Sequence, residues 1–76
     1  SGDSKEAVKY YDMIVKKYEK GFLSAEALTN IGRIYEDEGN MEKAFEVYSR
    51  VVNEFPEIVT EYARLRQSAL SEKFRN

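Results

Sequence analysis

Residues 28–56, LTNIGRIYEDEGNMEKAFEVYSRVVNEFP, predict two amphipathic helices joined by a tight turn. Apolar residues recur at helical spacing on both sides of the turn. They are Ala27, Leu28, Ile31, Ile34 and Tyr35 before it, and Ala44, Tyr48, Val51 and Phe55 after it. Gly39 suits the left-handed residue that follows a helix, and Asn40 suits the cap that begins the next one. Pro56 lacks a backbone N–H, so it marks a boundary and fits an early position of a further helix.

Gly32 lies in the middle of the helix that precedes this turn. A glycine there costs about 1 kcal/mol relative to alanine, so its presence indicates that another helix approaches closely. Ala44 is a second small residue at this approach, and Tyr35 and Tyr48 fill the space around it. We therefore expect Gly32→Leu to destabilise the fold severely by overpacking.

The N-terminal segment predicts another amphipathic helix, which starts near Ser4 with Asp3 as its cap. Its apolar stripe consists of Ala7, Tyr11, Ile14 and Tyr18. Gly21 is the expected left-handed residue at its end, and Ser24 is the expected N-cap of the following helix. A fourth helix is predicted near the C-terminus, and we expect it to fray after Ser71. Its apolar stripe consists of Tyr62, Leu65 and Ala69.

The composition argues against several classes of function. Seventy-six residues make one domain or a piece of one, with a marginal core. The chain has no cysteine and no histidine, which removes the usual zinc ligands, the thiol and imidazole nucleophiles and the neutral-pH general base. We therefore expect no metal, no cofactor and no enzymatic activity. The net charge of −2, with both signs interspersed, argues against nucleic-acid binding. No apolar run approaches the roughly 18 residues of a membrane-spanning helix, so no membrane insertion is expected.

An internal repeat relates the first predicted helix to the third at an offset of 37 residues. The offset aligns turn residues with turn residues and apolar residues with apolar residues. The aligned pairs are Gly2 with Gly39, Asp3 with Asn40, Ala7 with Ala44, Val8 with Phe45, Tyr11 with Tyr48, Ile14 with Val51, Val15 with Val52, and Tyr18 with Phe55. A fixed period in this range is typical of helical solenoids.

The spacing of these residues resembles the 34-residue tetratricopeptide repeat (TPR). The positions that carry the resemblance are Leu28, Ile31-Gly32, Tyr35, Ala44, Tyr48 and Pro56. It implies an all-α fold of about four helices, arranged as antiparallel helical hairpins in a fragment of an α-solenoid. Residues 1–76 would form one TPR-like domain. Within it, residues 2–24 resemble the second half of a repeat, 25–58 a complete repeat, and 59–76 a capping helix or the first helix of a next repeat.

Some positions depart from the family pattern. Leu28 stands where the family prefers Trp, Val51 stands where it prefers Ala, and three residues are inserted around 20–24. The lengthened repeat and the Glu54-Phe55-Pro56 ending resemble bacterial cell-envelope TPR proteins of the Tol–Pal and outer-membrane-assembly kind. No signal peptide is visible, so cytoplasmic and bacterial periplasmic or cell-envelope locations both stay open. Whether Ser1-Gly2 is native, and whether the chain is part of a longer array, also stays open.

The resemblance implies a protein–protein interaction scaffold that binds a protein or peptide in a groove lined by the first helix of each repeat. The groove-facing positions carry over to Glu26, Thr29, Asn30, Arg33 and Asp37, joined by Ala63, Arg64 and Gln67 if the fourth helix acts as another first helix. Of these, Asn30, Arg33, Asp37, Arg64 and Gln67 are the predicted partner-binding residues. Arg33 with Arg64 would receive a carboxylate in bidentate fashion. The alternative for these side chains is an ordinary solvated helix surface.

A second interpretation is structural self-association without a foreign ligand. The first predicted helix lacks a preceding helix of its own repeat, so its apolar surface at Tyr10, Tyr11 and Ile14 would be partly uncovered. We expect a homodimer through this surface. Separately, the acidic run 36–38 predicts an electronegative patch that steers a basic partner. The run lacks the ligand spacing of an EF-hand calcium loop.

Overall fold

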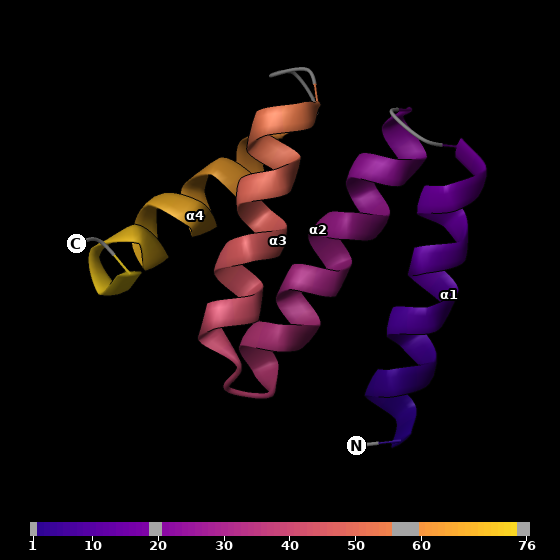
Figure 1. The fold of residues 1–76 in the computed structure, drawn as a ribbon, viewed down its shortest axis with the longest axis horizontal. Coiled ribbons are helices and arrows are strands. Elements are labelled where there is room, and N and C mark those ends of the chain that lie inside the picture. The colour runs from indigo at the N-terminus through magenta and orange to yellow at the C-terminus, as the bar shows by residue number, and fades with distance from the viewer. Residues whose placement is uncertain (1, 19–20, 56–59, 75–76) are drawn as a thin grey trace.

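The computed structural model describes residues 2–18, 21–55 and 60–74, which fold into helices without any strand in these ranges. The helices are α1 (Gly2–Tyr18), α2 (Phe22–Asp37), α3 (Met41–Glu54) and α4 (Glu61–Phe74) (Figure 1). The predicted all-α class is confirmed. Pro56 lies outside the described residues. In the described part of the chain we find no helix with the length and hydrophobicity that a bilayer-spanning segment requires.

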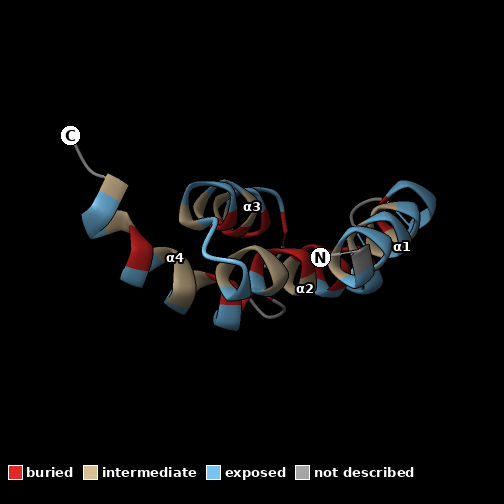
Figure 2. Ribbon diagram, turned by 90° about the horizontal axis from the view of Figure 1, so that it is seen from below, coloured by how far each residue is buried: buried red, intermediate tan, exposed pale blue. Residues whose placement is uncertain are grey.

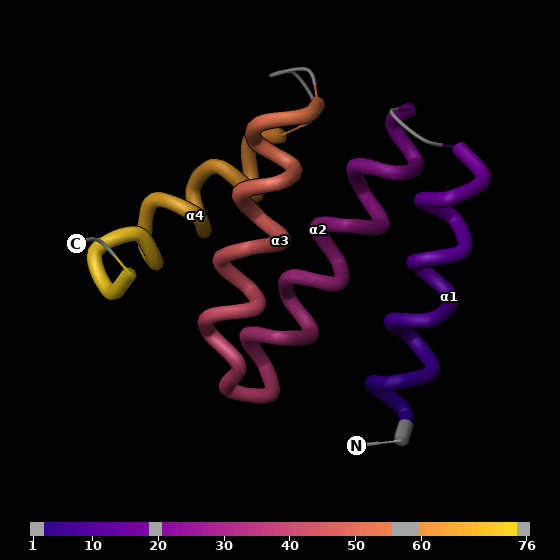
Figure 3. The backbone as a smooth tube through the Cα atoms, in the orientation of Figure 1, coloured from indigo at the N-terminus to yellow at the C-terminus, as the bar shows by residue number. Residues whose placement is uncertain are grey.

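Successive helices run in alternating directions, and each packs against the next. The tube in Figure 3 follows this path, with α1 and α4 at the two ends and α2 and α3 between them. Seen from below, α3 lies in one layer while α2 and α4 lie in the other (Figure 2). This arrangement confirms the predicted antiparallel hairpins of TPR type.

The turn between α2 and α3 has the predicted glycine–asparagine geometry. Gly39 adopts a φ of 80°, the left-handed conformation that favours glycine. The N–H of Asn40 donates to the carbonyl of Tyr35 at 2.8 Å, and the N–H of Gly39 donates to that of Glu36 at 2.9 Å. These two bonds form a Schellman motif. The Asn40 side chain then accepts from the N–H of Lys43 at 3.3 Å, which caps α3.

The core is centred where α2 meets α3 and extends toward α1 and α4 (Figure 2). Its buried apolar residues are Val15, Ala25, Ala27, Leu28, Ile31, Ala44, Tyr48, Val51, Phe55, Ala63 and Leu70. The predicted close approach at Gly32 is confirmed, because a Cβ atom there would lie 2.5 Å from Cε1 of Tyr48. The missing side chain therefore makes room for a tyrosine ring from the facing helix.

Two predicted helix boundaries are wrong. The helix α1 begins at Gly2, so Asp3 lies in its first turn instead of capping it. Gly21 has a φ of −78°, outside the left-handed region, and is itself the N-cap of α2. Ser24 is fully buried inside α2, and its hydroxyl donates to the carbonyl of Val15 at 3.4 Å. That carbonyl is one of the last four of α1, which a helix leaves without an intrahelical partner. Ser24 therefore joins α1 to α2 instead of starting α2.

The predicted apolar stripe of α4 is also wrong. Tyr62 and Leu65 are 43% and 61% exposed, and Ala69 is exposed as well. The buried apolar residues of α4 are Ala63 and Leu70, which lie seven positions apart on one face. The helix also continues to Phe74, beyond the expected fraying point, and the Phe74 ring stacks on Phe45 of α3 at 5.4 Å.

Candidate functional site

A groove runs between α2 and α4 and consists of two adjoining pockets. One has a volume of about 460 Å³ and is lined by Arg33, Glu36, Asp37, Met41, Tyr62 and Arg66. The other has a volume of about 310 Å³ and is lined by Phe22, Glu26, Thr29, Asn30, Arg33 and Tyr62. Both pockets share Arg33 and Tyr62, so they adjoin, and we call the two together the α2–α4 groove.

Arg33 and Tyr62 meet in the middle of this groove. The guanidinium carbon of Arg33 lies 5.2 Å from the centroid of the Tyr62 ring, a cation–π distance. The Tyr62 ring in turn packs edge-on against Tyr48, with 6.1 Å between centroids. Tyr48 is fully buried, so the groove floor rests directly on the core.

Glu36 of α2 accepts hydrogen bonds from α3 and α4 and so links the three helices at the groove. Its carboxylate accepts from the hydroxyl of Tyr48 at 2.9 Å and from Nε of Arg66 at 2.9 Å. A terminal nitrogen of Arg66 donates to the second carboxylate oxygen, which makes the pair bidentate. The hydrogen bonds from Arg66 are the main reason that the pKa of Glu36 lies below its usual value. Burial, with the Glu36 hydrogen bond, raises the pKa of Tyr48 well above its usual value.

The sequence did not predict this cluster. In the sequence, Glu36 belongs to the acidic run 36–38, which predicts an electronegative patch on the surface. In the structure its side chain is only 14% exposed, whereas Asp37 and Glu38 are exposed. The partners of Glu36 lie 12 and 30 residues away. Their positions depend on how α3 and α4 pack, so no local pattern around Glu36 could have identified them.

The predicted residues on α2 line the groove. Asn30, Arg33 and Asp37 all border one or both pockets, as do Glu26 and Thr29. The hydroxyl of Thr29 donates to the Ala25 carbonyl of its own helix at 2.8 Å. The Asn30 side-chain amide makes no hydrogen bond to any residue within the described ranges and is half-buried.

The predicted residues on α4 lie elsewhere. Arg64 donates to the hydroxyl of Thr60 at 3.2 Å, and Gln67 donates to the hydroxyl of Ser49 on α3 at 3.4 Å. Ala63 is fully buried. Burial of Ala63 on α4 turns Arg64 and Gln67 out of the groove, and Tyr62 and Arg66 form its far wall instead. Arg33 and Arg64 therefore do not converge on a common carboxylate site.

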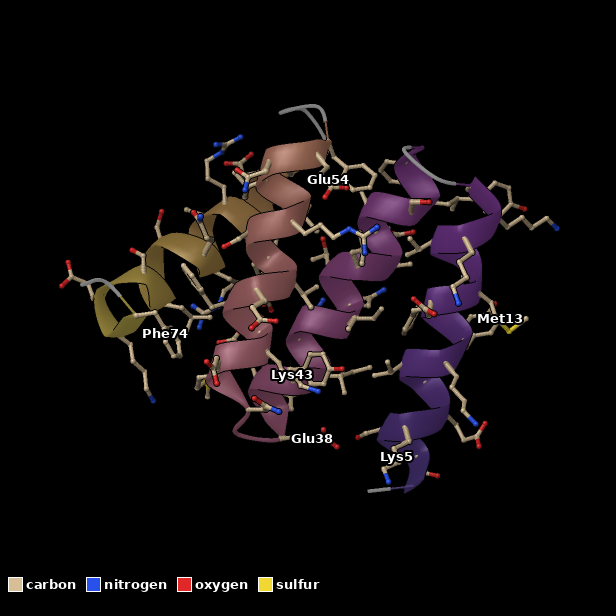
Figure 4. All side chains as sticks on the ribbon, in the orientation of Figure 1. Lys5, Met13, Glu38, Lys43, Glu54 and Phe74 are labelled. Atoms are coloured by element: carbon tan, nitrogen blue, oxygen red, sulfur yellow. The ribbon has the colours of Figure 1, made fainter. Side chains whose placement is uncertain are left out.

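A second surface, on α1, is apolar and open. Tyr10 and Met13 are 61% and 67% exposed, and Met13 points away from the other helices (Figure 4). A hollow of about 390 Å³ lies beside them, lined by Tyr10, Met13, Ile14, Lys17, Tyr18 and Leu23. Of the three residues predicted here, Tyr10 and Ile14 line the hollow. Tyr11 packs against the core and touches the Tyr10 ring edge-on, with 5.6 Å between centroids.

Residues 25–57 match the family model of the tetratricopeptide repeat. The matched residues include most of α2, the whole turn and all of α3. No curated protein and no solved structure shows significant similarity to the chain. Repeats of this family generally mediate protein–protein interactions, and their stacked helices form concave binding surfaces. Among the described residues, no group of three or more His, Cys, Asp or Glu side chains is placed to hold a metal ion.

Proposed function

We propose that the tetratricopeptide repeat at residues 25–57 makes this chain a non-enzymatic interaction scaffold, and that the α2–α4 groove binds a peptide segment of another protein. The observation that carries the proposal is the pair of adjoining pockets between α2 and α4. The two pockets adjoin at Arg33 and Tyr62, with polar side chains of α2 on one wall and the exposed ring of Tyr62 on the other.

Four polar side chains lie in a row along the wall of the groove that α2 forms. Glu26, Asn30, Arg33 and Asp37 follow each other at spacings of four, three and four residues, so they share one face of the helix. The Asn30 amide both donates and accepts, which suits the backbone of an extended peptide. The series therefore favours a peptide with an acidic residue opposite Arg33 and basic residues on either side of it.

The far wall supplies an apolar contact. Tyr62 is 43% exposed and Phe22, at the end of the groove, is 61% exposed. An apolar side chain of the peptide would bury these two rings further, because aromatic rings at interfaces contribute large contact areas. Arg66 adds little net charge, since Glu36 already pairs with it. Asn30, Arg33 and Asp37 are therefore the proposed polar contacts, with Tyr62 in place of Arg64 and Gln67.

The test is selection of random displayed peptides on the immobilised chain. Selected peptides should carry an acidic residue and should bind Arg33→Glu at least about tenfold more weakly, as expected for a lost charge-assisted contact. Arg50→Glu is the matched control, because Arg50 lies on α3, outside the groove, and pairs within the described ranges with the exposed Glu54. An equal loss of peptide affinity in both variants would refute the groove as the binding site. So would NMR amide chemical-shift changes on peptide binding that are confined to α1.

A second candidate function is structural self-association. The open apolar surface at Tyr10 and Ile14 favours it, since such patches on soluble proteins normally have a partner. The two functions use different surfaces, so they can be tested separately.

We further propose that the repeat belongs to the bacterial cell-envelope kind. Its support is the Glu54-Phe55-Pro56 ending and the insertion around residues 20–24. Fractionation of cells that make the natural protein tests this proposal. Recovery in the periplasmic or envelope fraction is expected, and recovery only in the cytoplasm would overturn it.

A further inference from the structure

Three apolar residues of α1 are less buried than their counterparts in α3. The 37-residue offset aligns Ala7, Tyr11 and Ile14 with three residues of α3 that are fully buried. Those counterparts are Ala44, Tyr48 and Val51. Ala7, Tyr11 and Ile14 are only half-buried. The reason is that α3 packs between α2 and α4, whereas α1 packs mainly against α2. One side of α1 therefore has the composition of a packed surface without a packed neighbour.

An exposed stripe of α1 beside these residues has opposite charges at its two ends. Asp3, Tyr10 and Lys17 follow each other at intervals of seven residues, so they lie on one face of the helix. All three are exposed. Tyr10 is the middle residue of α1, with an acidic residue toward the N-terminal end and a basic residue toward the C-terminal end. We call Asp3, Tyr10, Met13, Ile14 and Lys17 the α1 flank.

We propose that the α1 flank binds the α1 flank of a second copy of this chain, in an antiparallel pair with its two-fold axis at Tyr10. In this pairing, Asp3 of one copy faces Lys17 of the other, because both lie about 10.5 Å from Tyr10 along the helix axis. The same contact occurs twice, as a two-fold axis requires. Ile14 faces the small residue Ala7 of the second copy, and Met13 faces Glu6, because the members of each pair lie on the same side of Tyr10 around the helix and at similar distances from it.

The antiparallel direction follows from charge. A parallel pair would set Asp3 against Asp3 and Lys17 against Lys17, which is repulsive at both ends. The antiparallel pair makes both ends attractive and also opposes the two helix dipoles. The hollow beside Ile14 is bordered by Lys17, so the acidic first turn of the second copy would approach a cation there.

Among the described residues of α4, at the opposite end of the molecule, the exposed side does not have opposite charges at its two ends, because Glu61 and Glu72 are both acidic. The outer face of α4 has Glu61, Arg64, Ser68 and Glu72 at helical spacing, all polar. Tyr62, Leu65 and Ala69 are also exposed on α4, but the ring of Tyr62 already packs on Arg33 and Tyr48 at the α2–α4 groove. Self-association is therefore assigned to α1 alone, which predicts a closed dimer and not an extending chain of copies.

The test measures the mass of the 76-residue chain by sedimentation across a concentration series. We expect a monomer–dimer equilibrium for the unchanged chain. Asp3→Lys and Lys17→Asp should each raise the dimer dissociation constant about tenfold, because each makes both symmetric charge pairs repulsive. The combined variant Asp3→Lys with Lys17→Asp should restore the original constant. In a parallel pair, like charges would face each other at both ends in every variant, so neither the single changes nor their combination would alter the dissociation constant. An unchanged constant in all three variants would overturn the proposal.

A second pair of variants tests the position of the axis. Tyr10→Lys should abolish the dimer, since it places two cations at the two-fold axis. Leu65→Lys is the matched control, because Leu65 has the same 61% exposure as Tyr10 but lies on α4. Helix content measured by circular dichroism should be unchanged in both. A monomer at every concentration for the unchanged chain, or dissociation by Leu65→Lys, would overturn the proposal. Arg33→Glu should lose peptide binding and keep the dimer, which separates the two proposals.

Discussion

Replacement of Gly32 by alanine should destabilise this protein, although the same change stabilises most helices. A Cβ atom at Gly32 would lie 2.5, 2.8 and 2.9 Å from three ring carbons of Tyr48. Unstrained carbon–carbon contacts lie at about 3.5–4.0 Å, so the overlap is about 1 Å. The ring has little freedom to move, because Tyr48 is fully buried and its hydroxyl is held by Glu36.

Two opposing effects decide the magnitude. Alanine gains about 1 kcal/mol over glycine in a helix interior. Overpacking a well-packed core costs about 1–3 kcal/mol, and an overlap this deep with a fixed ring belongs in the upper part of that range. The expected net loss is about 1–2 kcal/mol, which lowers the thermal midpoint of a domain of this size by roughly 5–15 °C. Gly32→Leu should be worse, since its side chain cannot be accommodated at all.

Thermal denaturation followed by circular dichroism measures this effect, and a double-mutant cycle identifies its cause. Tyr48→Leu removes the ring that Gly32 accommodates, at a cost of its own. In that background Gly32→Ala should be neutral or stabilising, by up to about 1 kcal/mol. A higher thermal midpoint for Gly32→Ala alone would refute the packing argument, since helix propensity would then outweigh the contact.

Three further changes have definite expected outcomes in thermal or denaturant unfolding. Tyr48→Phe should lower the free energy of unfolding by about 1 kcal/mol, because it removes one hydrogen bond to Glu36 and keeps the ring. Glu36→Gln should lower it by about 1–3 kcal/mol at neutral pH by breaking the pair with Arg66. In the folded state the pKa of Glu36 lies below its usual value of 4.5, so the stability that the ionised carboxylate contributes is fully present above pH 4.5. This stability is lost as the pH falls through the lowered pKa. The difference between Glu36→Gln and the unchanged chain should therefore shrink in acid, and a constant difference would contradict the assignment. Asn40→Ala should cost about 1 kcal/mol by removing the cap that accepts from Lys43, and an unchanged midpoint would show that this cap contributes nothing.

The groove shows how a small error in one helix changes a predicted site. On α2, the predicted residues Asn30, Arg33 and Asp37 border the groove. On α4, the predicted residues Arg64 and Gln67 are directed to Thr60 and Ser49. The rotation of α2 could be predicted because its apolar face is strongly marked. The apolar residues of α4 are spread around the helix, and its most regular apolar spacing lies on the exposed side.

The amino-acid sequence by itself determined the number of helices, the turn at Gly39-Asn40 and the buried faces of α2 and α3. These features depend on local chemistry: helical periodicity, a left-handed glycine, an asparagine cap and a glycine that admits a facing ring. Each acts over a few residues, so each can be recognised without knowing the fold.

The tertiary structure alone decided the rotation of α4, the burial of Ser24 and the cluster formed by Glu36, Tyr48 and Arg66. Each of these depends on residues that are far apart in the sequence and become neighbours only when the helices pack. Ser24 is a good N-cap by its residue type, yet it is buried because its hydroxyl reaches a carbonyl at the end of α1. Glu36 is an acidic surface residue by its neighbours in sequence, yet packing brings a tyrosine and an arginine to it, and their hydrogen bonds make its partial burial stable.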